Sequence, residues 1–185
     1  MKIIKTGRLL LASILMLFAV HAFSQTTTPA DDTAINAKVK SAISANPTVS
    51  GLNVVTMTDK GVVTISGNVD SDSEASTLVE IAQSTPGVKD VDASKLIVKD
   101  SKQPFADMLI TSKIKGLYIQ EKLFGDKDIS AMSIHVETKN GDVYLTGTSD
   151  NQKQADNAII IAKSVSGVKS VKSDIKVNNT TASTH

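Results

Sequence analysis

Side chains that could act as nucleophiles, bases or transition-metal ligands are scarce in this chain. The sequence contains no cysteine and three histidines, and only His135 and His185 lie beyond residue 24. His135 alternates with apolar neighbours, so we expect it on the face of a strand that points away from the core. The histidine spacing does not suit a transition metal, and no phosphate-binding GxxxxGK loop is present. We therefore predict a protein without catalytic residues, metal site, cofactor or small-molecule substrate.

A short acidic cluster, Asp70, Asp72 and Glu74, offers carboxylates of the kind that bind calcium. These residues closely follow Gly67, at the point where an apolar helical pattern begins. Carboxylates in the first turn of a helix interact favourably with its dipole. We therefore expect helix capping here rather than a calcium site.

The most suggestive chemistry lies on a helical segment that begins near Asp107 and continues to about Phe124. It carries more apolar side chains than one buried stripe requires, together with several lysines. Lysine stems can lie along apolar groups while their ammonium groups reach an anionic membrane surface. The candidate lipid-binding residues are Lys113, Lys115, Ile119, Lys122, Leu123 and Phe124.

The same apolar residues could instead pack against a neighbouring domain. About eight residues, from Lys99 to Ala106, would join the two domains, and Pro104 stiffens the connection. So short a linker suits two domains in contact. The sequence leaves both interpretations open.

A duplication organises the elements that position these residues. The segment from Lys60 to Gly67 returns at a constant offset as Asn140 to Gly147, and the segment 86–91 returns as 166–171. The repeated unit has about 70 residues, close to the lower limit for independent folding. We therefore predict two tandem domains, at 31–99 and 105–178.

Each repeat shows the same order of patterns. A helix follows Asp31 and Asp32, which we expect to act as its N-cap, then come a hairpin, a second helix and a last strand. The predicted class is α+β, with two small α-β-β-α-β domains, each a three-stranded mixed sheet with helices packed on one face. We expect the repeated glycines to have structural roles. Gly61 and Gly141 would serve the hairpin turns, and Gly67 and Gly147 would allow close approaches of the backbone. Gly87 and Gly167 would be helix C-caps.

The ends of the chain have other expected roles. Residues 1–24 combine a basic start, an apolar run and small residues before a cleavage point near Ser24 and Gln25, which is typical of a secretory signal peptide. We expect the tail, residues 179–185, to be disordered. Removal of Lys2, Lys5 and Arg8 with the signal leaves 17 of the 20 basic residues against 19 acidic ones. That balance argues against a general nucleic-acid binder.

The hairpin sequence Gly-Val-Val-Thr-Ile-Ser-Gly at 61–67 and the sequence Pro-Gly-Val-Lys-Asp-Val at 86–91 resemble the BON domain of bacterial exported proteins. The resemblance covers nearly all of both repeats. It implies binding to phospholipid surfaces, and tandem BON proteins of this kind are associated with osmotic stress and with chaperone-like help to outer-membrane and exported proteins. Two departures are the absence of a lipid-bearing cysteine and five additional residues around 122–128 of the second repeat.

Together these features predict a non-enzymatic periplasmic stress-response protein of the cell envelope. The expected partner is an anionic phospholipid surface, with binding chiefly through the second domain. The alternative is a chaperone or interaction module that holds unfolded or outer-membrane proteins on an exposed sheet face or edge.

Overall fold

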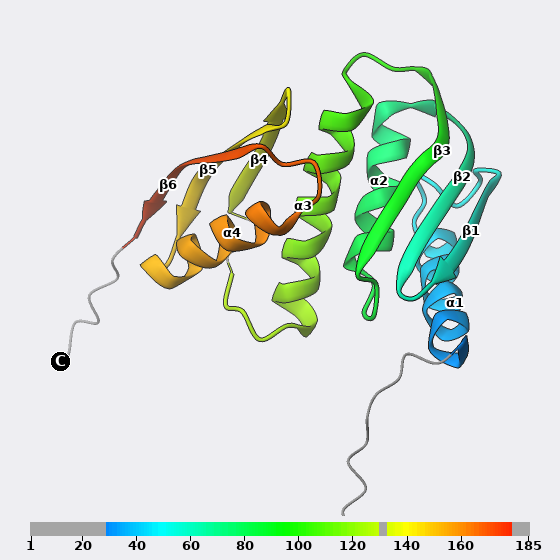
Figure 1. Cartoon of the computed structure of the whole chain (residues 1–185), viewed down its shortest axis with the longest axis horizontal. Helices are drawn as coiled ribbons and strands as arrows, with labels where there is room; N and C mark the ends of the chain where they lie inside the picture. Colours follow the sequence, from blue (N-terminus) through cyan, green and yellow to red (C-terminus); the bar gives the residue numbers. More distant parts are fainter. Residues whose placement is uncertain (1–28, 130–132, 179–185) are drawn as a thin grey trace, which may run out of the picture.

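The computed structural model describes residues 29–129 and 133–178. The expected signal peptide and its cleavage point, and the tail at 179–185, lie outside these ranges. Two copies of one element order follow each other along the chain (Figure 1). The elements are α1 (Pro29–Ala45), β1 (Val54–Asp59), β2 (Val62–Ser71), α2 (Asp72–Ser84), β3 (Asp90–Asp100), α3 (Phe105–Phe124), β4 (Ile134–Lys139), β5 (Asp142–Ser149), α4 (Gln152–Ser164) and β6 (Ser170–Val177).

Each copy contains one three-stranded mixed sheet, in the orders β1-β2-β3 and β4-β5-β6. The hairpin strands pair antiparallel, and the last strand of each copy pairs parallel with the central strand. A parallel neighbour requires a crossover connection, which α2 and α4 provide. The predicted fold class is confirmed.

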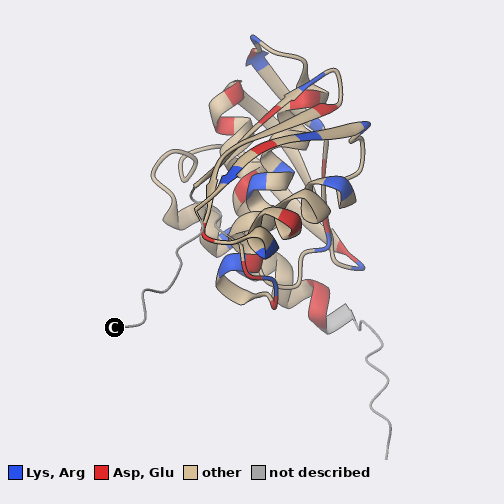
Figure 2. Cartoon of the chain, turned by 90° about the vertical axis from the view of Figure 1, so that its left-hand side faces the viewer, with Lys and Arg blue, Asp and Glu red and all other residues tan. Residues whose placement is uncertain are grey.

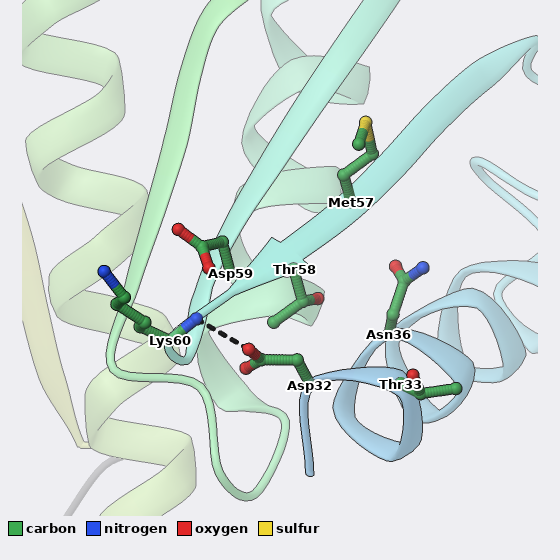
Figure 3. A pocket seen from close by; sticks show the side chains of 7 residues that line it. All are labelled: Asp32, Thr33, Asn36, Met57, Thr58, Asp59 and Lys60. Atoms are coloured by element: carbon green, nitrogen blue, oxygen red, sulfur yellow. Dashed lines mark hydrogen bonds between the residues drawn. The ribbon is translucent and has the colours of Figure 1, made fainter. Parts of the chain in front are cut away.

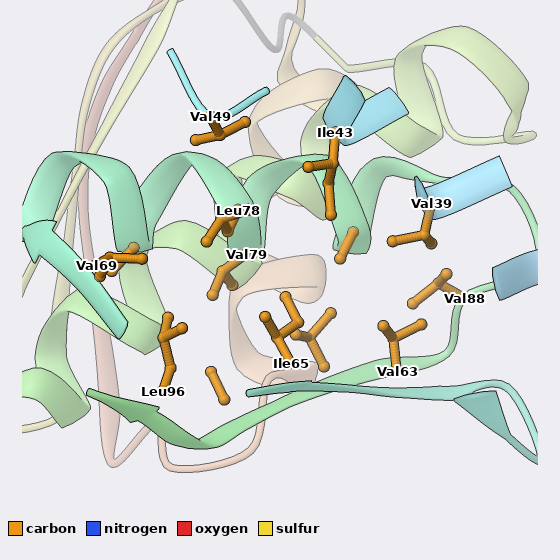
Figure 4. Close-up of a cluster of buried hydrophobic side chains, with 14 of the residues drawn as sticks. Val39, Ile43, Val49, Val63, Ile65, Val69, Leu78, Val79, Val88 and Leu96 are labelled. Atoms are coloured by element: carbon orange, nitrogen blue, oxygen red, sulfur yellow. The ribbon is translucent and has the colours of Figure 1, made fainter. Parts of the chain in front are cut away.

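The core of the first domain lies between its sheet and the helices α1 and α2 (Figure 4). Val63 and Ile65 alternate along β2 with full burial, while Leu78 from α2 and Val39 from α1 close the other side. The second domain repeats this arrangement around α3 and α4. Its buried residues include Ile114, Tyr118, Val143, Leu145, Ala158 and Ile161.

Both hairpins turn through two residues with positive φ. Lys60 and Gly61 have φ of 52° and 81°, and Asn140 and Gly141 have φ of 55° and 83°. Two successive positive φ values are the signature of the type I′ turn, whose twist matches that of the flanking strands. Gly61 and Gly141 thus occupy the turn positions, where a positive φ favours glycine.

The predicted helix caps need correction at both ends. Helix α1 begins at Pro29, so Asp31 and Asp32 lie in its first turn and not at its N-cap. Helices α2 and α4 have Thr85 and Val165 as their C-caps. Gly87 and Gly167 stand two residues further on, in the turn that leads to the last strand. A Cβ at Gly87 would meet Ile35 of α1, and a Cβ at Gly167 would meet Ile110 of α3.

Candidate functional site

Helix α3 lies between the two domains and packs against both (Figure 1). Ile110, Ile114 and Tyr118 belong to the core of the second domain. Met108, which is 2% exposed, belongs to the core of the first domain, and Phe105 and Leu109 pack against that core. Part of the apolar surplus predicted for this helix is therefore interdomain contact.

Two lysines of α3 pair with carboxylates of the first domain. The Lys113 Nζ lies 2.7 Å from Asp90 Oδ1, and the Lys113 side chain is only 7% exposed. The Lys115 Nζ lies 3.7 Å from Glu80 Oε1 on α2. Burial raises the pKa of the Glu80 carboxyl above its usual value, and the nearby Lys115 ammonium offsets this shift only in part.

Further interdomain contacts involve the C-terminal end of α2 and the turn that follows it. The Gln120 amide Nε2 donates to the backbone oxygens of Thr85 and Val88, at 3.0 Å and 3.3 Å. A Cβ placed at Gly116 would lie 2.6 Å from Gln83 Cβ, so glycine allows the two helices to approach closely. The structure thus places the domains in contact, the arrangement that the short linker favours.

The C-terminal end of α3 is different, because it projects beyond both cores. Leu123 and Phe124 are each 63% exposed, and Lys122 beside them is exposed as well. The Gly125 N–H donates to Glu121 O at 3.1 Å, and Lys127 Nζ lies 3.2 Å from Glu121 Oε1. These contacts fix the end of the helix while its apolar side chains face solvent.

The six candidate lipid-binding residues therefore fall into two groups. Lys113 and Lys115 lie against the first domain, and Ile119 is partly buried. The exposed group, hereafter the α3 tip, consists of Lys122, Leu123 and Phe124. On the side of the molecule that carries the second domain, basic and acidic positions are interspersed along the ribbon (Figure 2). Because the charges on this side are mixed, electrostatic attraction to an anionic surface would come from Lys122 at the α3 tip.

The acidic cluster near Gly67 makes internal hydrogen bonds. Ser71 is the N-cap of α2 and forms a capping box with Glu74. The Asp72 carboxylate accepts hydrogen bonds from the Ser101 hydroxyl and the Lys102 N–H, and Asp70 pairs with Lys99 at 2.6 Å. Within residues 29–129 and 133–178, no group of three or more His, Cys, Asp or Glu side chains could hold a metal ion.

His135 lies exposed on β4, on the face opposite the core, as its alternation with apolar neighbours predicts. Of the helices in the described ranges, none has the length and apolar character needed to cross a membrane.

The sequence analysis did not predict that one aspartate in each first helix binds the hairpin turn of its domain. The Asp107 carboxylate accepts hydrogen bonds from the N–H groups of Asn140 and Gly141, at 2.7 Å and 2.8 Å. The Asp32 carboxylate does the same for Lys60 and Gly61, at 2.7 Å and 2.8 Å. The available signal was an aspartate at the start of both first helices combined with the repeated hairpin turn.

Asp32 also lines a pocket of about 460 Å³ between the start of α1 and β1 (Figure 3). The other lining residues are Thr33, Asn36, Met57, Thr58, Asp59 and Lys60. The pocket is open and mixed in polarity, and it holds no pair of groups arranged as nucleophile and base.

Comparisons with known proteins agree with the duplicated fold. The family model described as BON domain matches residues 31–100 and 109–179. The chain is 41% identical over 151 residues to the Osmotically-inducible protein Y of Escherichia coli (strain K12), covering 79% of this chain and 72% of that protein. It is 31% identical over 153 residues to the Outer membrane lipoprotein DolP of Haemophilus influenzae, covering 79% and 74%.

Among solved structures, the C-terminal domain of CdsD, a structural protein of the type III secretion system of Chlamydia trachomatis, is 19% identical with a TM-score of 0.32. That match covers 79% of this chain and 66% of the other, and it is too distant to add to the description of the fold. The two matched domains and the identity to these relatives are sufficient: the chain belongs to the BON-domain family, and it carries two copies of the domain.

Proposed function

We propose that this protein is a non-enzymatic stress-response protein of the cell envelope that associates weakly with anionic phospholipid surfaces. Support for the setting comes from its relatives, one named as osmotically inducible and one as an outer-membrane lipoprotein. The expected signal peptide agrees with export to the periplasm.

The observation that carries the proposal is the α3 tip. Leu123 and Phe124 expose apolar surface directly after the exposed Lys122, at the end of a helix that packs on both domains. Each lysine near an anionic surface contributes about 1 kcal/mol, and an inserted leucine or phenylalanine contributes roughly 1.5 to 3 kcal/mol on full burial. Three such residues account for weak, reversible binding but not for permanent anchoring.

Lys113, Lys115 and Ile119 also belong to the predicted lipid-binding set, but Lys113 and Lys115 pair with the first domain and Ile119 is partly buried. Lys113 and Lys115 hold α3 on the first domain through Asp90 and Glu80. Changing them would disturb the domain interface as well as the charge. A test of lipid binding should therefore address the tip.

The experiment is flotation of the chain without the expected signal peptide, residues 25–185, with neutral and with anionic liposomes, at low and at physiological salt. We expect flotation on anionic liposomes that decreases with salt, and a marked loss in the double variant Leu123→Ser with Phe124→Ser. Ile160→Ser is the matched control, because Ile160 is an exposed apolar residue of α4, 56% exposed. Absence of flotation under all conditions, or equal flotation of the double variant, would refute the proposal.

A second candidate function is that of a periplasmic chaperone or interaction module. The observation in its favour is exposed apolar surface on the first sheet, where Val55, Met57 and Ile97 are 55%, 68% and 62% exposed. Suppression of the aggregation of an unfolding client, independent of salt, would favour this function over lipid binding.

A further inference from the structure

Strand β1 forms an edge of the first sheet, because within the described residues it pairs only with β2. Val55 and Met57 alternate on its outward face, 55% and 68% exposed. An edge strand carries unpaired backbone N–H and C=O groups, and apolar side chains beside them make it a template for another strand.

The second domain protects the corresponding edge. The pairing registers show which positions of the two edges correspond. Val55 pairs with Ser66, and at the equivalent position His135 pairs with Thr146. Met57 pairs with Thr64, and at the equivalent position Glu137 pairs with Tyr144. His135 and Glu137 are exposed, as is Lys139 after them. Charged and polar side chains at an edge discourage pairing with a further strand. The two copies thus differ at the positions that decide whether an edge accepts a partner.

The opposite edge of the first sheet is less suited to pairing. Its strand β3 has a register shift against β2 between Thr64 and Ser66, and such irregularities twist an edge away from regular pairing. Helix α3 also packs near β3, where Phe105, Leu109 and Lys113 line a shared hollow with it. In contrast, β1 pairs with β2 without interruption from Val54 to Asp59.

One buried polar atom near the end of β1 is left without a partner. The Thr58 Oγ1 is buried and has no hydrogen-bond partner within the described part of the chain. The corresponding Thr138 hydroxyl of the second domain pairs with the Thr111 hydroxyl at 2.8 Å. Thr58 lines the pocket of about 460 Å³ between α1 and β1, together with Met57 (Figure 3). The first domain therefore combines an open edge, exposed apolar side chains and an adjoining pocket.

We propose that β1 accepts an extended segment of another, unfolded polypeptide as a fourth strand of the first sheet. Backbone hydrogen bonds would supply the binding, Val55 and Met57 would contact alternate side chains of the segment, and its end would enter the pocket. The proposal rests on the second candidate function, that of a chaperone or interaction module, and is independent of lipid binding at the α3 tip.

The size of the edge favours this occupant over a second copy of the chain. The uninterrupted edge of β1 has six residues, a length of about 20 Å. Pairing of two β1 strands would bring about six residues from each side together, whereas a stable interface uses roughly 20 to 30 a side. Short, sequence-tolerant pairing suits transient capture of an extended segment.

The test uses a fluorescent peptide of alternating valine and threonine with terminal lysines, titrated with the full chain and followed by anisotropy. A second peptide of the same sequence carries N-methyl groups on alternate amides, which removes the hydrogen-bonding edge. The variant is Val55→Lys with Met57→Lys. Its matched control is His135→Lys with Glu137→Lys on β4, and thermal unfolding checks that all forms are folded.

We expect the unmodified peptide to bind the parent and the β4 control alike. Binding to the β1 variant should be at least about tenfold weaker, and the N-methylated peptide should bind none of the forms measurably. Equal binding of both peptides, or equal binding by the β1 variant, would overturn the proposal. So would sedimentation that shows a stable dimer of the parent which the β1 variant dissociates, because the edge would then belong to a second copy.

Discussion

At the residue scale, the stability of each domain depends on one aspartate that joins its first helix to its hairpin. The Asp107 carboxylate is 6% exposed and accepts two hydrogen bonds from the turn at Asn140 and Gly141. Asp32 makes the same two bonds in the first domain but is partly exposed. A buried carboxylate with charged hydrogen bonds contributes more than a solvated one.

We predict that Asp107→Ala lowers the free energy of unfolding by about 2 to 4 kcal/mol. The substitution removes two charge-assisted hydrogen bonds and leaves the buried Gly141 N–H without its acceptor. The matched variant Asp32→Ala should cost less, about 1 to 2 kcal/mol, since water can reach its site. Urea unfolding measures both. Equal stability of Asp107→Ala and the parent would disprove the structural role.

Glu80 makes a pH-dependent contribution at the domain interface. Its pKa is raised above 4.5 by burial, so the folded state favours the protonated carboxyl. The contribution of Glu80 to stability is therefore complete below pH 4.5 and declines as the pH rises through the elevated folded-state pKa. We predict that Glu80→Gln becomes more stable relative to the parent as the pH increases to neutral. Denaturant unfolding across this pH range is the measurement, and a pH-independent difference would contradict the prediction.

At the scale of elements, α3 is the helix that unites the molecule. It supplies Ile114 and Tyr118 to one core and Met108 to the other. Gly116 brings it close to α2, where a Cβ would lie 2.6 Å from Gln83 Cβ and 2.9 Å from the Glu80 backbone oxygen. A backbone atom cannot move aside as a flexible side chain can.

We predict that Gly116→Ala destabilises the chain by about 1 to 3 kcal/mol, although alanine is the better helix former by about 1 kcal/mol. The control is Gly51→Ala, where an added Cβ would have no neighbour within 4 Å. That control should stay within about 0.5 kcal/mol of the parent. A Gly116→Ala chain that is as stable as the parent in urea would show that the helices are not in close contact.

Local patterns were enough to predict most elements. Asn140 and Gly141 identify their turn because the required positive φ restricts the residue types, and the alternation around His135 places it on the outer face. The burial of the Lys113 side chain could not be predicted from such local patterns. Its burial depends on Asp90 of another domain, and helical periodicity contains no information about such a partner. The hydrogen bonds of Asp107 to the turn at Asn140 could not be predicted either, because the two residues are far apart in the sequence.

At the scale of the whole molecule, the shared helix gives the two copies different surfaces. In the first domain α3 covers α2, and within the described residues β1 pairs with no strand on its outer side. The second domain has a polar edge at β4 and presents the α3 tip. Because α3 is held by both cores, Leu123 and Phe124 are displayed on a rigid support. The duplication thus provides two different candidate binding surfaces, one for each proposed function.

Membrane contact of the α3 tip can be tested most directly with a single tryptophan. The chain contains no tryptophan, so Phe124→Trp introduces one unambiguous reporter. We predict that its emission shifts to the blue on addition of anionic vesicles at low salt and returns as salt is added, while Ile160→Trp on α4 stays unchanged. No shift for Phe124→Trp, or an equal shift at both positions, would contradict lipid binding through the α3 tip.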